Sequence, residues 1–332
     1  MDKQSHSQIQ VVGHNWAIDF LSRQQQAGRV PQALLLSGPQ NVGKSTVARF
    51  IAQVLNCQTS PIPCGQCLSC RKVVNNIHPD VRIFDDDSRA IKIDEIRALQ
   101  RELSLSPYEG HYRVAILCNF ERATISAANA LLKTLEEPAS QVVMILTATD
   151  PGALLPTIVS RCQAISLRSL PVGQVSSALE ERWHAAPEKA ELLAHLSAGR
   201  LGWAVRALED ENMLARRQDC FDALFQQLHS NRVERLAYAQ IVGRNSAVLK
   251  ETLTIWLTIW RDLLLLQSGG QTRILNIDWQ DRLAAIASHT TISQAKEMAN
   301  RLRTALINLE HNVNPRLTLE VVLLQLPAYQ TN

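Results

Sequence analysis

The sequence predicts an α/β domain with a parallel sheet, followed by domains made only of helices. Apolar strand-like runs alternate with helical segments up to about residue 168, a pattern typical of a parallel sheet covered on both faces. Beyond Pro171 the periodicity is helical, with no convincing strand pattern. The 332 residues are too many for one ordinary core. We therefore expect an α/β domain over 1–168, a small helical domain over 169–208 and a larger helical domain over 209–332.

Five segments are the candidate strands of this sheet. They are Ala33–Leu36, Val81–Phe84, Val114–Cys118, Val142–Thr147 and Ala164–Leu167. Helices are expected between them near Thr46–Asn56, Asp94–Leu103 and Ser126–Glu136. Glu137-Pro138 ends the last of these helices, because proline cannot continue a helix from its interior.

The helical part of the chain begins with three short segments. They are Val172–His184, Pro187–Ser197 and Leu201–Leu208, with Gly199 and Gly202 marking the break between the last two. A polar joint, Glu209–Asn212, leads into a longer helical region from Met213 to Leu326.

That longer region includes Ala247–Gln267 and Ile292–Leu309, separated by the glycine-containing loop Ser268–Arg273. Its large apolar positions fit two arrangements, the core of a helical bundle or a surface that packs against sister subunits. These positions are Trp256, Trp260, Leu263 and Leu264.

Composition and charge restrict the class of protein. The chain is 46% hydrophobic, as folded globular proteins are, and its most apolar helical stretch, Trp256–Leu266, is interrupted by Arg261 and Asp262. The polar segment Met1–Gln10 lacks the apolar core of a signal peptide. A cytoplasmic protein with no membrane partner is expected. The net charge of +3 is too balanced for a chain that holds DNA by electrostatics alone.

A complete phosphate-binding motif stands between the first strand and the first helix. Gly38, Gly43, Lys44 and Ser45 fit G-x-x-x-x-G-K-[ST] without substitution. Glycines let backbone N–H groups turn around phosphate oxygens, Lys44 reaches the β/γ-phosphates, and the Ser45 hydroxyl ligates Mg²⁺. The flanking strand and helix argue against a chance glycine-rich turn. We expect ATP or ADP, with Mg²⁺, at Gly38, Pro39, Asn41, Val42, Gly43, Lys44, Ser45 and Thr46.

Four of the seven cysteines, Cys57, Cys64, Cys67 and Cys70, fall in the segment 57–70. Their spacing, C-x₆-C-x₂-C-x₂-C, suits a closed tetrahedral Zn²⁺ site of structural type. Pro61, Pro63 and Gly65 are expected to keep the segment irregular. The alternative, free cysteines in a loop, is less favourable because clustered exposed thiols oxidise. The remaining cysteines, Cys118, Cys162 and Cys220, are expected to be small buried residues.

Three segments resemble the bacterial clamp-loader subunits of the AAA+ ATPase superfamily. They are the run Ala127–Pro138 (AANALLKTLEEP), the segment Leu155–Cys162 with its Ser160-Arg161-Cys162, and Val12-Gly13-His14 together with Gly28–Leu34. A zinc knuckle after the phosphate-loop helix is also a feature of that family. The resemblance covers Val11 to about Ala204 and implies an AAA+ domain, a helical lid and a helical collar that mediates oligomerisation.

The resemblance also implies a subunit that does not hydrolyse ATP. The family's Asp-Glu pair should fall on Cys118 and Asn119, and neither is acidic. An Asp there would hold Mg²⁺, and the Glu would polarise the attacking water. In Gly199-Arg200-Leu201-Gly202, a glycine stands where the active family places a sensor arginine.

In that family the Ser-Arg-Cys arginine, here Arg161, acts on the ATP of a neighbouring subunit. The implied role is that of a stator in the machine that loads the sliding clamp on primed DNA. The implied partners are the delta and tau/gamma subunits and, through the assembled complex, the clamp and DNA.

Two other functions stay open from the sequence. An active ATPase could use Glu121 or Asp85, although the triplet Asp85-Asp86-Asp87 is more typical of a solvated loop. A zinc-dependent DNA-binding protein is the other, since Arg71 and Lys72 follow the cysteines. However, Ser60–Ser69 holds neither an aromatic residue nor a basic cluster.

Overall fold

The computed structural model describes residues 9–59, 62–86, 89–270 and 273–327. They divide into two compact units, each considered by itself. The first comprises the described part of 1–174 together with 199–202, and the second the described part of 175–198 and 203–332. The predicted separation of a lid over 169–208 from a collar over 209–332 stays a prediction.

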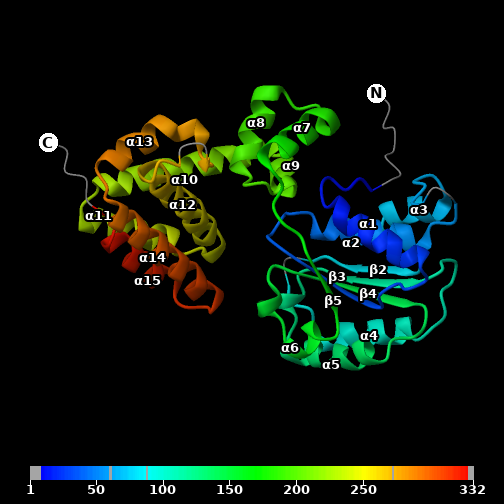
Figure 1. Ribbon diagram of the computed structural model, residues 1–332. Helices are drawn as coiled ribbons and strands as arrows, with labels where there is room; N and C mark the ends of the chain where they lie inside the picture. The colour runs from blue at the N-terminus through cyan, green and yellow to red at the C-terminus, as the bar shows by residue number, and fades with distance from the viewer. Residues whose placement is uncertain (1–8, 60–61, 87–88, 271–272, 328–332) are drawn as a thin grey trace. The chain divides into compact units, whose positions relative to one another are not determined.

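A five-stranded parallel sheet forms the centre of the first unit (Figure 1). Its strands are β1 (Ala33–Ser37), β2 (Val81–Phe84), β3 (Arg113–Leu117), β4 (Val142–Ala148) and β5 (Gln163–Ser166). The spatial order is β2-β3-β4-β1-β5, and every neighbouring pair is parallel. All five predicted strands are therefore confirmed, each within one residue at either end. The strand β1 lies inside the sheet, so the loop that follows it leaves from the middle of the carboxyl edge.

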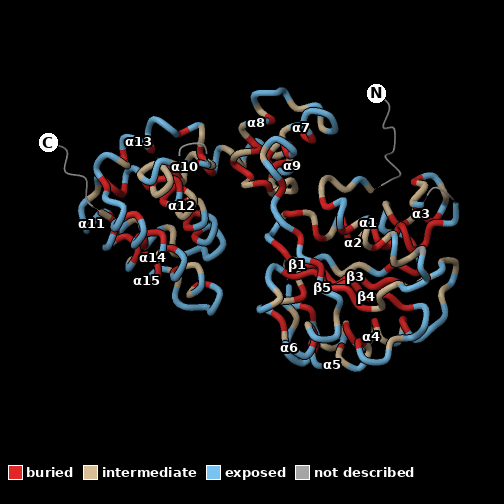
Figure 2. Tube along the Cα trace, in the orientation of Figure 1, coloured by how far each residue is buried: buried red, intermediate tan, exposed pale blue. Residues whose placement is uncertain are grey.

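Helices cover both faces of the sheet, and the inner strands β1, β3 and β4 are buried between them (Figures 1 and 2). One face carries α1 (Asn15–Gln26), α2 (Lys44–Asn56) and α3 (Leu68–Val74), and the other carries α4 (Ile93–Leu103), α5 (Ile125–Glu136) and α6 (Pro156–Val159). Alternate strand residues serve two separate cores. Leu34 and Leu36 pack with α2, whereas Leu35 packs with α4 and α5. Burial on both faces explains why β1, β3 and β4 are largely continuous apolar runs in the sequence.

The helices from α7 onward follow the sheet. They are α7 (Val172–Trp183), α8 (Pro187–Leu196), α9 (Leu201–Glu209), α10 (Glu211–His229), α11 (Arg232–Val242), α12 (Ser246–Gln267), α13 (Gln280–Ser288), α14 (Ile292–Glu310) and α15 (Pro315–Leu324). Trp256, Trp260 and Leu263 are fully buried in the core of the second unit, and Leu264 packs against that core. Of the two arrangements predicted for these positions, the bundle core is the correct one.

Several local predictions were wrong. Gly202 lies inside α9, so the break before that helix is at Gly199 alone. The polar joint Glu209–Asn212 shortens to Asp210, which caps α10 by accepting a hydrogen bond from Asn212. The cysteine segment is not irregular throughout, because α3 begins at Leu68. Pro61 and part of the loop Ser268–Arg273, residues 271 and 272, lie outside the described residues.

None of the described helices combines the length with the apolar character that a membrane crossing requires.

Candidate functional site

The predicted phosphate loop lies at the carboxyl end of β1 and runs into α2. Gly38 has φ of 147°, and a Cβ atom there would lie 2.2 Å from the Leu167 carbonyl oxygen, so only glycine fits. The Lys44 side chain is buried inside the loop. Its Nζ donates to the carbonyl oxygens of Gly38 at 2.7 Å and Pro39 at 3.0 Å. The structure thus brings together the backbone, the lysine and the α2 N-terminus, as an anion site requires.

Cys118 faces the Ser45 hydroxyl. It follows the last residue of β3, and its Sγ lies 3.4 Å from Ser45 Oγ. Burial raises the pKa of the Cys118 thiol to about 11, so the thiol is neutral at pH 7. Mg²⁺ prefers oxygen ligands and is held in hydrolysing phosphate-loop proteins by a carboxylate at this place. A neutral thiol does not fit that ion. The geometry therefore agrees with the prediction that Cys118 stands where hydrolysing relatives carry an acidic residue.

The carboxylates considered for an active ATPase have other partners. Asp85 pairs with Arg49 of α2 at 2.8 Å, and Asp86 pairs with Arg89 at 2.9 Å. Asp87 lies outside the described residues. Both described members of the triplet are thus engaged in ion pairs at the surface.

Glu121 is the other carboxylate near the end of β3. Its Oε1 accepts a hydrogen bond from the backbone N–H of Thr149 at 3.1 Å, and its Oε2 is buried without a partner among the described residues. Asn119 adopts a left-handed conformation with φ of 50°, and its N–H donates to Thr147 Oγ1 at 2.9 Å. The segment after β3 is therefore tied to the end of β4.

A close backbone approach explains the glycine at the sensor position. The Gly202 N–H donates to the Asn41 carbonyl oxygen of the phosphate loop at 3.0 Å. A Cβ atom on Gly202 would lie 2.9 Å from that oxygen, which leaves no room for a side chain without movement. His14 also contacts the loop, with Nε2 3.1 Å from the Val42 carbonyl oxygen. Sequence reasoning noticed both residues but not these contacts, which join distant parts of the chain.

The four predicted metal-binding cysteines come together. The Sγ atoms of Cys57, Cys64, Cys67 and Cys70 all lie within 4.8 Å of one another, and those of Cys64 and Cys70 are 3.9 Å apart. A Zn²⁺ with four sulfurs at about 2.3 Å gives sulfur–sulfur distances of about 3.8 Å. The donor set and its spacing therefore fit zinc.

Hydrogen bonds to sulfur favour the thiolate that zinc requires. Backbone N–H groups of Cys64 and Cys67 donate to Cys57 Sγ at 3.3 Å and to Cys64 Sγ at 3.2 Å. The Thr59 hydroxyl donates to Cys64 Sγ at 2.9 Å and, with the backbone of Cys67, lowers the pKa of Cys64 to about 6. Burial raises the pKa of Cys70, so metal binding must displace its proton.

Of the three cysteines predicted to be buried, only one is fully so. Cys118 is buried, whereas Cys162 and Cys220 are half-buried.

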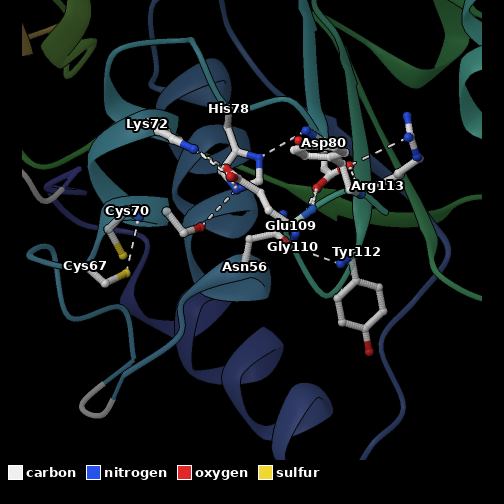
Figure 3. A network of polar contacts seen from close by, with 12 residues as sticks. Asn56, Cys67, Cys70, Lys72, His78, Asp80, Glu109, Gly110, Tyr112 and Arg113 are labelled. Atoms are coloured by element: carbon white, nitrogen blue, oxygen red, sulfur yellow. Dashed lines mark hydrogen bonds and ion pairs between the residues drawn. The ribbon is translucent and has the colours of Figure 1, made fainter. Parts of the chain in front are cut away.

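A polar network fastens the cysteine segment to the sheet domain (Figure 3). The hydroxyl oxygen of Ser69, the residue before Cys70, lies 3.0 Å from His78 Nε2. Lys72 of α3 pairs with Glu109 at 2.6 Å. These contacts link α3 to the loop before β2 and to the loop before β3.

Asp80 is the buried centre of this network. Its carboxylate accepts the backbone N–H groups of Tyr108 at 2.7 Å, Glu109 at 2.9 Å and Gly110 at 2.8 Å. Burial opposes ionisation of Asp80, but these three donors outweigh it and hold the pKa below its usual value. Sequence reasoning missed this residue, because its partners lie about 30 positions away and form no motif.

Arg161 follows α6, on the face of the sheet opposite to α2 (Figure 1). Its NH1 donates to the Thr157 carbonyl oxygen at 2.9 Å, and its Nε donates to Glu136 Oε1 at 2.8 Å. About a third of the side chain, 35%, is exposed. The predicted finger residue is thus held at the surface and is not on the face that carries its own phosphate-loop helix.

Comparison with known proteins places this fold in a family. Residues 13–171 match the family model described as "DNA polymerase III, delta subunit", and residues 211–327 match the model of its C-terminal part. A DNA polymerase III subunit delta' from Bacillus subtilis is 29% identical over 308 residues, which are 90% of this chain and 91% of that relative. The chain belongs to the DNA polymerase III delta' family. The resemblance to bacterial clamp-loader subunits is therefore confirmed.

Subunits with other names match part or most of the chain. The DNA polymerase III subunit tau of Escherichia coli is 36% identical over 198 residues, 58% of this chain and 31% of that relative. Among solved structures, a DNA polymerase III gamma subunit-related protein from Thermotoga maritima is 19% identical. It covers 92% of this chain and 98% of its own, with a TM-score of 0.43. The family assignment therefore rests on the sequence matches.

Proposed function

We propose that this chain is a clamp-loader subunit that does not hydrolyse ATP itself and that supplies Arg161 to ATP bound by a neighbouring subunit. The observation that carries the proposal is the 3.4 Å contact between Ser45 Oγ and Cys118 Sγ. A neutral thiol at this place cannot take the part of the carboxylate that organises Mg²⁺ for hydrolysis. Membership of the delta' family supports the same role.

Arg161 suits action on a phosphate held by another subunit. An arginine is always charged, and its planar guanidinium makes forked contacts with phosphoryl oxygens. Fingers of this kind are worth about 10³–10⁵ in the rate of phosphoryl transfer. Such an arrangement makes hydrolysis depend on assembly, because the finger and the nucleotide belong to different chains.

The partners follow from the family. Delta and tau/gamma subunits would assemble with this chain in the cytoplasm, and the sliding clamp and primed DNA would be reached through the complex. The net charge of +3 agrees with a subunit that does not itself supply most of the contact with DNA.

Two cofactors are part of the proposal. Zinc at Cys57, Cys64, Cys67 and Cys70 stabilises the fold and takes no part in chemistry, since four sulfurs leave no open position for water. ATP or ADP binds weakly at Gly38–Thr46 as a structural ligand.

The alternatives have less support. An active ATPase would need Asp85 or Glu121, and Asp85 is paired with Arg49 while Glu121 accepts from the backbone of Thr149. A zinc-dependent DNA-binding role would need a basic or aromatic surface beside the cysteines. There, Lys72 is neutralised by Glu109.

The test is ATP turnover by the chain alone and by the reconstituted loader. The chain alone should not turn over ATP. In the loader, Arg161→Lys should lower DNA- and clamp-stimulated turnover, because lysine keeps the charge but loses the fork. Turnover by the isolated chain that disappears in Lys44→Ala would show an active ATPase and contradict the proposal. A Cys67→Ser variant that stays folded but loses DNA binding in a gel shift would favour the DNA-binding role instead.

A further inference from the structure

The guanidinium of Arg161 is held by Glu136, the last residue of α5. Glu136 Oε1 lies 2.8 Å from Arg161 Nε and 2.5 Å from NH2, so one carboxylate oxygen takes two adjacent N–H donors. The two residues lie 25 positions apart in the sequence and meet where the ends of α5 and α6 approach each other.

The third nitrogen of the guanidinium, NH1, contacts residues close to Arg161 in the sequence. NH1 donates to the Thr157 carbonyl oxygen at 2.9 Å and lies 3.4 Å from Ser160 Oγ. A guanidinium has five N–H donors. These four contacts hold the head group in one orientation and leave N–H capacity for a further anion at the exposed end.

Glu136 comes from the run Ala127–Pro138, whose two glutamates the proposed function does not otherwise use. The helix ends there because Glu137 departs from helical geometry before Pro138. The negative end of the α5 dipole therefore also favours the cation. The pair is partly solvent-exposed, with 35% of the arginine and 49% of the glutamate side chain accessible. Such a pair adds little to folding stability, so its main effect is to order the arginine.

We propose that Glu136 is a positioning residue for Arg161, which holds the guanidinium ready for the phosphate of ATP on a neighbouring subunit. This inference rests on the proposed function of Arg161. An arginine without this partner samples many rotamers, and the ordering must then occur in each catalytic event. We expect loss of the carboxylate to lower the turnover number of the loader about tenfold, a cost of the size of arginine side-chain ordering.

The experiment uses the reconstituted loader with its sliding clamp and primed DNA, and measures kcat and KM for ATP. Glu136→Ala should lower kcat about tenfold and leave KM within about twofold, as expected for a group that acts through the finger in the transition state. Glu136→Gln should keep most of the activity, because the amide oxygen can still accept from Nε and NH2. The matched control is Glu137→Ala, which removes the neighbouring exposed carboxylate and should leave kcat unchanged.

A double variant shows whether Glu136 affects kcat only by positioning Arg161. If Glu136 acts only through Arg161, the variant Glu136→Ala/Arg161→Ala should have the kcat of Arg161→Ala alone. A further loss in the double variant, or a kcat for Glu136→Ala equal to or above that of the wild type, would overturn the inference. If Arg161→Ala lowers kcat while Glu136→Ala does not, the inference fails and the proposed function stands. If Arg161→Ala has no effect, the proposed function itself fails. Gel filtration checks that each variant assembles.

Discussion

Replacing Asp80 by asparagine should destabilise the sheet domain and loosen its connection to the cysteine segment. Two of the three backbone donors bind Oδ2 and one binds Oδ1, and the side chain is fully buried. An asparagine has one carbonyl oxygen, so its NH₂ group must face at least one N–H donor. A lost bond to a charged acceptor and an unpaired buried donor together cost about 2–4 kcal/mol.

The loss is measurable by urea unfolding followed by circular dichroism. In a domain of this size, about 2–4 kcal/mol corresponds to a fall in melting temperature of about 4–16 °C. The control is Asp94→Asn, since that side chain is 89% exposed and only 3.9 Å from Arg97 at its closest; it should lose less than about 1 kcal/mol. A loss below about 0.5 kcal/mol for Asp80→Asn would refute the reasoning.

The stability lost in Asp80→Asn should depend on pH. The pKa of Asp80 is lowered in the folded protein, so its charge stabilises the fold above the ordinary aspartate pKa, about 4. That contribution is lost as the pH falls through the folded value. The difference in free energy of unfolding between wild type and Asp80→Asn should therefore be constant from about pH 5 to about pH 8. It should become smaller on further acidification. A difference that widens on acidification would contradict the assignment.

Three further predictions concern the ligand sites. Removing zinc with a chelator, or substituting Cys67→Ser, should lower the melting temperature. Binding to tau/gamma subunits should stay intact as long as the chain is folded. A loss of that binding at unchanged melting temperature would contradict a purely structural role for zinc. Titration calorimetry with Mg·ATP should show weak binding to the wild type, and Lys44→Ala should abolish it. If the wild type gives no heat of binding, the nucleotide is not a ligand of this loop. Cys118→Asp should place a carboxylate beside Ser45 and make nucleotide affinity about tenfold more dependent on Mg²⁺. Cys118→Ser, which adds only a neutral hydroxyl, should not have this effect. Equal Mg²⁺ dependence in both variants would show that this position does not control the ion.

The sequence was sufficient for the sheet because β1, β3 and β4 are largely apolar runs with distinct ends, buried between two layers of helices. The phosphate loop and the four cysteines were also predictable, since each depends on close spacing along the chain. The four-residue helix α6 escaped notice, because one turn has no periodicity to detect.

The contacts that complete the candidate sites could not be predicted in this way. Asp80 binds a loop about 30 residues away, and Glu136 meets Arg161 across 25 residues. Gly202 could be noticed only as a missing arginine, whereas the structure gives its reason in the 3.0 Å hydrogen bond to Asn41. Such contacts arise when the sheet brings distant segments together, and no local pattern records them.

The most direct measurement is single-turnover ATP hydrolysis by the reconstituted loader on clamp and primed DNA, with wild-type chain or Arg161→Ala. The account predicts that the variant assembles normally and that hydrolysis falls by about 10³-fold or more at the site served by this chain, the lower range for loss of an arginine finger. Unchanged hydrolysis in a fully assembled complex would contradict it, because Arg161 would then face no nucleotide.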